Sequence, residues 1–185
     1  MTTTALPLVK PTASQSVAGG VLISELIGVS TVYLGPLSYF FSIQERCPIV
    51  SRIGTTLGYL SVSIEPLVAP EWANGTREIE AFTPYEPPAI DQVEDQLEDF
   101  IDRTVLYRLT ILHADELVAR RKFPQVALRY GFFREPMQQT ETVIIDPSAQ
   151  RVDFNITTTH IADVTTAFVK YINGSSLVIE VYGSK

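Results

Sequence analysis

Apolar and polar residues alternate along much of this chain with the two-residue period of a β-strand. Leu60, Val62 and Ile64, for example, alternate with Ser61 and Ser63, which predicts a half-buried strand. Comparable runs predict strands near residues 29–34, 38–43, 58–65, 104–112, 125–133, 140–145, 152–158 and 177–182. We therefore expect a mainly β fold in which antiparallel strands pack as a sandwich.

The segment 104–112 is the strongest of these predicted strands. One face carries Val105, Tyr107, Leu109 and Ile111, and the other carries Leu106 and Leu112. Because both faces are apolar, the segment is predicted to be an interior strand rather than an edge strand.

Prolines and glycines punctuate the apolar runs. The pair Gly35-Pro36 predicts a turn after the first strand. Pro48 is expected to break the run that follows residue 43, and Pro66 is expected to end the strand at 58–65.

Two segments change to the period of a helix. Residues 90–101 place apolar side chains at helical spacing with acidic side chains opposite, which predicts a solvated acidic helix. Residues 163–172 predict a second helix with Asp163 as its N-cap, Phe168 and Ile172 on its buried face, and Gly174 as a left-handed end.

Length and composition set further bounds. The chain has 185 residues, a formal net charge of −7 and a single cysteine, Cys47. The acidic balance argues against general nucleic-acid binding, which needs clustered Lys and Arg. One cysteine forms no internal disulfide or CxxC pair, so a reducing, cytoplasmic setting is expected. Polar residues and glycines interrupt the apolar stretch 17–37, so no membrane span or leader is expected.

The same features suggest four segments. They are a disordered N-terminal segment at 1–20, a β-rich segment at 21–68, a linker with the acidic helix at 69–102, and a β-sandwich domain at 103–185.

Motifs that carry catalysis are missing from the sequence. It contains no GxxxxGK[ST], GxGxxG, HExxH or GxSxG motif. His113 and His160 lie far apart in sequence, and Cys47 is expected to be a packing residue rather than a nucleophile. The expectation is a non-catalytic chain with no catalytic residue, no cofactor, no metal and no small-molecule substrate.

Two stretches resemble a region behind the motor head in the kinesin-three family of microtubule transport motors. In the closing stretch VDFNITTTHIADVTTAFVKYINGSSLVIEVYG, the family has a helix of the form FVDYI and a strand ending in EVFG or EVWG. The matching residues are Phe168, Val169, Tyr171, Ile172, Ile179, Glu180, Val181, Tyr182 and Gly183. Upstream, the matching residues are Ile27, Gly28, Val32, Leu34, Leu37, Tyr39, Pro48, Ile49, Gly54, Gly58, Leu60 and Val62.

The resemblance implies a C2-like antiparallel β-sandwich with one or two short helices. It also implies a non-catalytic scaffold, or a segment that binds cargo or adaptor proteins, in a cytoplasmic and cytoskeleton-associated transport motor. The motor, forkhead-associated and pleckstrin-homology domains of that family have no counterpart here, so motor ATPase activity is not carried over. In the family, segment 21–68 would be the end of a preceding C2-like module.

Three alternatives follow from the same residues. The basic run Arg120, Arg121 and Lys122 could contact an anionic surface, which would make the chain a peripheral membrane-binding module with weak affinity for anionic lipid. The chain could instead belong to a ciliary or cytoskeletal scaffold without a motor. Finally, residues 27–66 could complete the same sandwich as 104–183, which would cover edges otherwise open to aggregation.

Overall fold

The computed structural model describes residues 24–68, 83–85 and 96–185. Its strands are β1 Ser24–Tyr33, β2 Ile43–Val50, β3 Thr56–Val68, β4 Thr83–Pro84, β5 Thr104–Asp115, β6 Gln125–Tyr130, β7 Gln138–Gln139, β8 Val143–Ile144, β9 Arg151–Asp163 and β10 Ser176–Ser184. One α-helix, α1 Thr166–Gly174, and three short 3₁₀ helices, η1 Gly35–Tyr39, η3 Leu97–Phe100 and η4 Val118–Arg121, complete the described elements.

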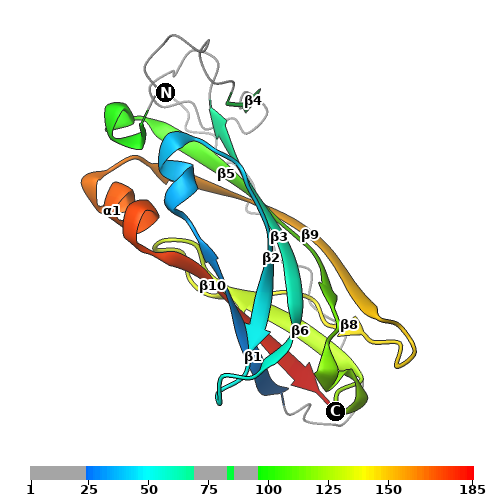
Figure 1. The fold of residues 1–185 in the computed structure, drawn as a ribbon. Coiled ribbons are helices and arrows are strands. Elements are labelled where there is room, and N and C mark those ends of the chain that lie inside the picture. Colours follow the sequence, from blue (N-terminus) through cyan, green and yellow to red (C-terminus); the bar gives the residue numbers. More distant parts are fainter. Residues whose placement is uncertain (1–23, 69–82, 86–95) are drawn as a thin grey trace, which may run out of the picture.

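These strands form one antiparallel sheet in the order β7-β6-β10-β1-β2-β3-β5-β9, with β4 beside β3 and β8 beside β6. The sheet curls so that its two halves face each other across a core, and η1, η3 and α1 gather at one end, whereas η4 lies at the other (Figure 1). The expected mainly β, sandwich-like fold with antiparallel strands is confirmed.

The N-terminal strands β1, β2 and β3 lie between C-terminal strands on both sides. β1 pairs with β10 along its whole length, and β3 pairs with β5 from Tyr59↔Asp115 to Leu67↔Leu106. Residues 27–66 and 104–183 therefore lie in the same sheet. This agrees with the alternative in which residues 27–66 complete the same sandwich as residues 104–183. The two segments share one hydrophobic core.

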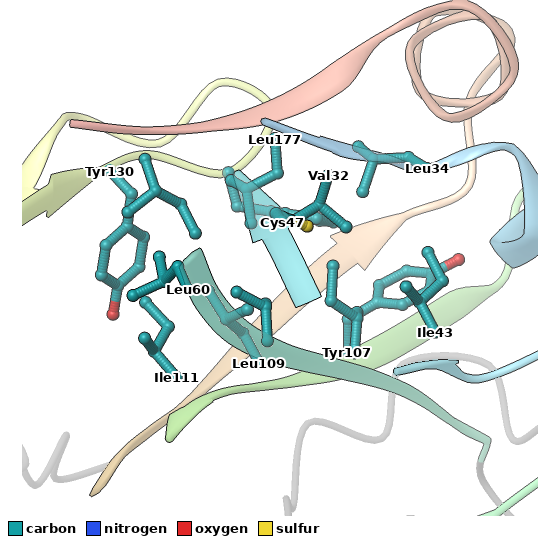
Figure 2. Packing of buried hydrophobic residues seen from close by; sticks show 14 of the residues in the cluster. Val32, Leu34, Ile43, Cys47, Leu60, Tyr107, Leu109, Ile111, Tyr130 and Leu177 are labelled. Carbon is teal, nitrogen blue, oxygen red and sulfur yellow. The ribbon is translucent and has the colours of Figure 1, made fainter. Parts of the chain in front are cut away.

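The core lies between the two halves of the curled sheet. Figure 2 shows Val32, Cys47, Leu60, Tyr107 and Leu177, which come from five different strands, pointing into the same space. Each of these five side chains is at most 3% exposed. Most apolar burial therefore comes from contacts between strands distant in sequence, and such burial is the main favourable contribution to stability.

β5 buries apolar side chains on both of its faces, as the sequence predicts. Val105, Tyr107, Leu109 and Ile111 are all buried in the main core. On the opposite face, Leu106 packs against its cross-strand partner Leu67 in a separate small cluster. β5 lies between β3 and β9, so the prediction of an interior strand is confirmed.

Proline does not break the sheet where the sequence suggested. Pro48 lies inside β2, opposite Tyr59 of β3, and Pro66 lies inside β3, opposite Tyr107 of β5. β2 pairs with β1 only at Val50. One edge of β2 is thus largely free of ladder hydrogen bonds to the strands described here, which is where a residue without an N–H is tolerated.

Other predicted boundaries were also wrong. Residues 38–42 form the end of η1 and a turn, because Pro36 favours a helical start, and Ile43 begins β2. The predicted strand 140–145 reduces to the two-residue strand β8. Of the predicted helix 90–101, residues 90–95 lie outside the described part of the chain, and the rest contains η3, a single 3₁₀ turn.

The C-terminal helix has its predicted buried face but different ends. Phe168 and Ile172 are fully buried. Asp163 belongs to β9, and the N-cap is Thr165, whose side chain accepts a hydrogen bond from the amide of Phe168. Gly174 is still helical, and no left-handed residue ends the helix, because Ser175 continues in an extended conformation into β10.

The two outer strands of the curled sheet meet through side chains. The Tyr130 hydroxyl of β6 lies 3.2 Å from Thr158 Oγ1 of β9, and His160 Nδ1 lies 2.6 Å from Glu135 Oε2. The His160 ring also stacks on Phe132 at 5.0 Å between centroids. These contacts join β9 to β6 and the loop that follows it, although no ladder of backbone hydrogen bonds links the two strands.

Tyr107 provides a stability prediction. Its ring is fully buried, and its hydroxyl has no hydrogen-bond partner among the described residues. Burial raises the pKa of this phenol far above its ordinary value. An unpaired buried hydroxyl costs about 1–3 kcal/mol. Tyr107→Phe is therefore expected to raise the free energy of unfolding by about 1 kcal/mol, measured by urea denaturation.

The matched control for this prediction is Tyr130→Phe. The Tyr130 hydroxyl is paired with Thr158, so its removal is expected to lower stability. A Tyr107→Phe variant that is less stable than the parent chain would contradict the assignment of Tyr107 as an unsatisfied group.

Candidate functional site at the basic end of the sheet

The basic run predicted as a contact site lies on an exposed helical turn. Arg120 and Arg121 belong to η4, and Lys122 follows it. Two buried apolar residues, Leu117 before the turn and Phe123 after it, fix this segment to the core. The anchors are six residues apart in sequence, and between them Arg121 and Lys122 are exposed whereas Arg120 is half-buried.

The three predicted contact residues differ in their partners. Arg120 donates a hydrogen bond to the carbonyl of Ala149 at 2.6 Å. Lys122 Nζ lies 2.8 Å from Glu25 Oε1 and 4.6 Å from the centre of the Phe123 ring. Arg121 is exposed and makes no ion pair with a described carboxylate. Arg121 is thus the most available of the three cations.

Two further cations that the sequence did not single out lie close to this run. Arg52 is in the turn between β2 and β3, and Lys185 follows β10. The hydrogen bond from Lys122 lowers the pKa of Glu25 below its ordinary value, and the positive charges of Lys185 and Arg52 add to that effect. Lys122, Lys185 and Arg52, which belong to three different segments, therefore all lie near the Glu25 carboxylate.

The strand pairing explains why these segments meet. Ser24 of β1 pairs with Ser184 of β10, which in turn pairs with Gln125 of β6. Lys185 and the residues before β6 are therefore neighbours of the start of β1. Figure 1 shows the C-terminus, the start of β1, the β2–β3 turn and the residues around η4 at the same end of the sheet, opposite α1.

Gly58 allows the β2–β3 turn to approach this end closely. Its φ is +150°, and a Cβ atom there would lie only 2.7 Å from the Asp115 carbonyl oxygen and 3.0 Å from the Leu117 Cα. A larger residue would push β3 away from the segment that leads into η4. The glycine thus helps to place the turn that carries Arg52 beside the basic run.

A shallow hollow of about 430 Å³ opens beside the basic run. It is lined by Glu116, Leu117, Val118, Arg120, Arg121 and Gln150. Arg46 Nη2 pairs with Glu116 at 3.0 Å, and Arg46 Nε lies 3.6 Å from Asp115. Asp115 and Glu116 are therefore both engaged by the same arginine.

A second hollow, also of about 430 Å³, lies where the outer strands of the curled sheet approach each other. Its lining is mostly uncharged: Tyr130, Gln138, Gln139, Thr140, Glu141, Thr142, Val143, Phe154, Asn155, Ile156 and Thr158. Asn155 has a φ of +49° at an irregularity in the β5–β9 pairing. This hollow contains none of the sequence-predicted contact residues.

The structure does not bring the two histidines together. His113 Nε2 contacts Ser61 Oγ at 3.0 Å and Asp115 at 3.3 Å, whereas His160 is buried against Glu135 and Thr158. Among the residues the structure describes, no three His, Cys, Asp or Glu side chains gather in an arrangement suited to a metal ion.

Cys47 is a buried core residue. Its side chain is 3% exposed and lies in the main hydrophobic cluster. Burial, together with the nearby charge of Glu45, raises the pKa of the Cys47 thiol to about 11. A reactive thiol needs the opposite environment, exposed and electropositive, so this cysteine is suited to packing.

Comparisons with known proteins do not extend this description. No protein-family model matches the chain, and no curated protein matches it. Within residues 24–68, 83–85 and 96–185, none of the helices has the length and apolar character needed to cross a membrane. The class that the geometry defines is a β-rich, sandwich-like protein built on one curled antiparallel sheet.

Proposed function

We propose that this chain is a non-catalytic binding segment of a kinesin-three-like microtubule transport protein. It acts as a C2-like scaffold that attaches the motor to cargo or adaptor proteins, or that contacts the motor domains themselves. Such a segment works in the cytoplasm, associated with the cytoskeleton. It needs no cofactor, because its role is to position other proteins.

The pairing of β1 with β10 is the observation that carries this proposal. The two stretches that resemble the family are far apart in sequence, yet their strands are adjacent, with Ser30 opposite Ile179 and Val32 opposite Leu177. If the two stretches resembled the family only by chance, their strands would not be expected to pair with each other. The order of the two stretches thus agrees with a single folded unit.

The closing motif has a physical role in that unit, which adds support. Phe168, Ile172, Ile179 and Val181 are fully buried. A Cβ atom on Gly183 would overlap the ring of Phe123, so the last residue of the motif must be small. Several of the residues that match the family are therefore ones on which the packing of this fold depends.

The transcript sequence upstream of the Met1 codon tests the proposal. An in-frame nucleotide-binding motor domain of the P-loop type is expected there. An upstream frame that encodes a scaffold without any motor would favour a ciliary or cytoskeletal scaffold instead, and would refute the assignment to a transport motor.

The non-catalytic part of the proposal has its own test. The purified chain is expected to turn over neither ATP nor ester, peptide or glycoside test substrates above a buffer blank. Reproducible turnover that is lost in a variant of the chain would refute it. This measurement is independent of whether a motor is encoded upstream.

A further inference from the structure

The distribution of charge on this molecule differs from what its net charge of −7 suggests. The end of the sheet with the basic run includes seven cations and five carboxylates from separate segments. The cations are Arg46, Arg52, Arg120, Arg121, Lys122, Arg151 and Lys185, and the carboxylates are Glu25, Asp115, Glu116, Asp146 and Asp153. The local balance is therefore positive.

The ion pairs at this end leave particular cations in excess. Arg46 engages Asp115 and Glu116, and Lys122 engages Glu25. Arg52, Arg121 and Lys185 form no ion pair with any carboxylate that the structure describes, although Arg52 and Lys185 lie close enough to lower the pKa of Glu25. These three cations are available to a partner.

The opposite end carries exposed charges of both signs, since Arg103 and Lys170 lie there beside an acidic group. Glu98, Asp99 and Asp102 are exposed in and next to η3, on the side of the molecule where α1 lies. A local excess of positive charge attracts an anionic surface even when the net charge of the molecule is negative. An anionic surface would therefore attract the basic end.

Two exposed apolar side chains extend from the basic end. Ile53 is 88% exposed in the β2–β3 turn, directly after Arg52, and Val118 is 65% exposed at the start of η4, close to Arg121. Single exposed apolar residues are common. Here two of the most exposed ones lie at the same end, on separate loops, each beside an unpaired arginine.

We propose that this end docks on an anionic phospholipid bilayer, with Ile53 and Val118 entering the headgroup region and Arg52, Arg121 and Lys185 contacting lipid phosphates. Apolar side chains flanked by cations match the two layers of a bilayer surface, because anionic headgroups cover an apolar interior. A soluble polyanion would satisfy the cations but would leave Ile53 in water. The inference does not depend on the kinesin-three assignment.

Sedimentation of the full chain with lipid vesicles tests the inference. The chain is expected to pellet with vesicles of phosphatidylcholine and phosphatidylserine and not with phosphatidylcholine alone. Binding is expected to fall as salt rises, because the Debye length shortens to about 8 Å at physiological ionic strength. Absence of binding to the anionic vesicles at low salt would overturn the inference.

Two variants separate the charged and apolar contributions. Arg52→Glu/Arg121→Glu is expected to weaken binding by well over tenfold, since each cation near an anionic membrane contributes roughly a fivefold gain in affinity. Ile53→Ser leaves the charge unchanged and is expected to weaken binding by roughly tenfold, because a buried apolar side chain is returned to water.

Matched controls lie at the other end of the molecule. Lys170→Glu reverses an exposed cation on α1, and Ile161→Ser removes an exposed isoleucine from β9. Both are expected to bind vesicles like the parent chain, and circular dichroism checks that all variants fold. An equal loss of vesicle binding in Lys170→Glu would overturn docking on a bilayer, and so would unchanged vesicle binding in Ile53→Ser. If Ile53→Ser binds unchanged and soluble inositol hexakisphosphate competes fully, the basic end binds soluble polyanions instead.

Discussion

Replacing Phe168 with aspartate is expected to unfold the whole described sheet rather than only the C-terminal segment. The Phe168 side chain is fully buried, and its ring lies 5.1 Å from Phe133 and 5.9 Å from Tyr107, between ring centroids. Removing a buried phenylalanine alone costs about 3–5 kcal/mol. An unpaired carboxylate in its place adds a desolvation cost. The total approaches the entire stability of a typical domain, about 5–15 kcal/mol.

Thermal denaturation followed by far- and near-ultraviolet circular dichroism measures this effect. The Phe168→Asp variant is expected to show no cooperative transition. Ala167→Asp is the matched control, since it introduces the same residue at the neighbouring, exposed position of α1, where an acidic side chain near the helix N-terminus is favourable. A Phe168→Asp variant as stable as this control would refute the register of the helix.

Residues 103–185 expressed alone are expected not to fold. In the full chain β5 pairs with β3, and β10 pairs with β1, so the fragment would expose an edge on each of these two strands. It would also lose the core side chains supplied by β1, β2 and β3, among them Leu60 and Ile64, which are fully buried. Burying one such side chain contributes about 1.5–3 kcal/mol.

Urea denaturation and amide hydrogen exchange test this prediction. The isolated fragment is expected to lack a cooperative transition and to exchange the amides of β10 rapidly. The control is the same fragment expressed together with residues 24–68, which is expected to recover protection in β10. A fragment that unfolds cooperatively by itself, with stability close to that of the full chain, would show that the N-terminal strands are dispensable.

The type of an element, strand or helix, was predicted best where the regular spacing of apolar residues continued over many residues. The alternation in β5 and the helical spacing around Phe168 each reflect one continuous contact surface, so both were predicted correctly. The prediction failed where a local rule competed with sheet pairing. Pro48 and Pro66 were expected to interrupt strands. Pro48 lies on β2, which has one largely unpaired edge, and Pro66 lies beyond the last pairing of β3 with β2 at Ile64, where fewer backbone N–H groups are needed.

The candidate site illustrates a different limit. Arg120, Arg121 and Lys122 were found because they are consecutive in sequence. Arg52, Ile53 and Lys185 were missed, because they lie far from the basic run in sequence. The pairing of β3 with β5 brings the β2–β3 turn to the basic end, and the pairing of β10 with β1 and β6 brings Lys185 there. The one local signal was an isoleucine between Arg52 and Gly54, where a turn usually carries polar residues.

By itself, the sequence determined that this protein is mainly β, that it has a short amphipathic helix near its end, and that a basic run interrupts an acidic chain. These features depend on neighbouring residues, whose periodicity and charge are local properties. Only the tertiary structure decided that residues 24–68 and 104–184 form one sheet and that scattered cations share a surface with two exposed apolar side chains. Strand pairing joins residues more than a hundred positions apart, and no local pattern encodes which strand a given edge will meet.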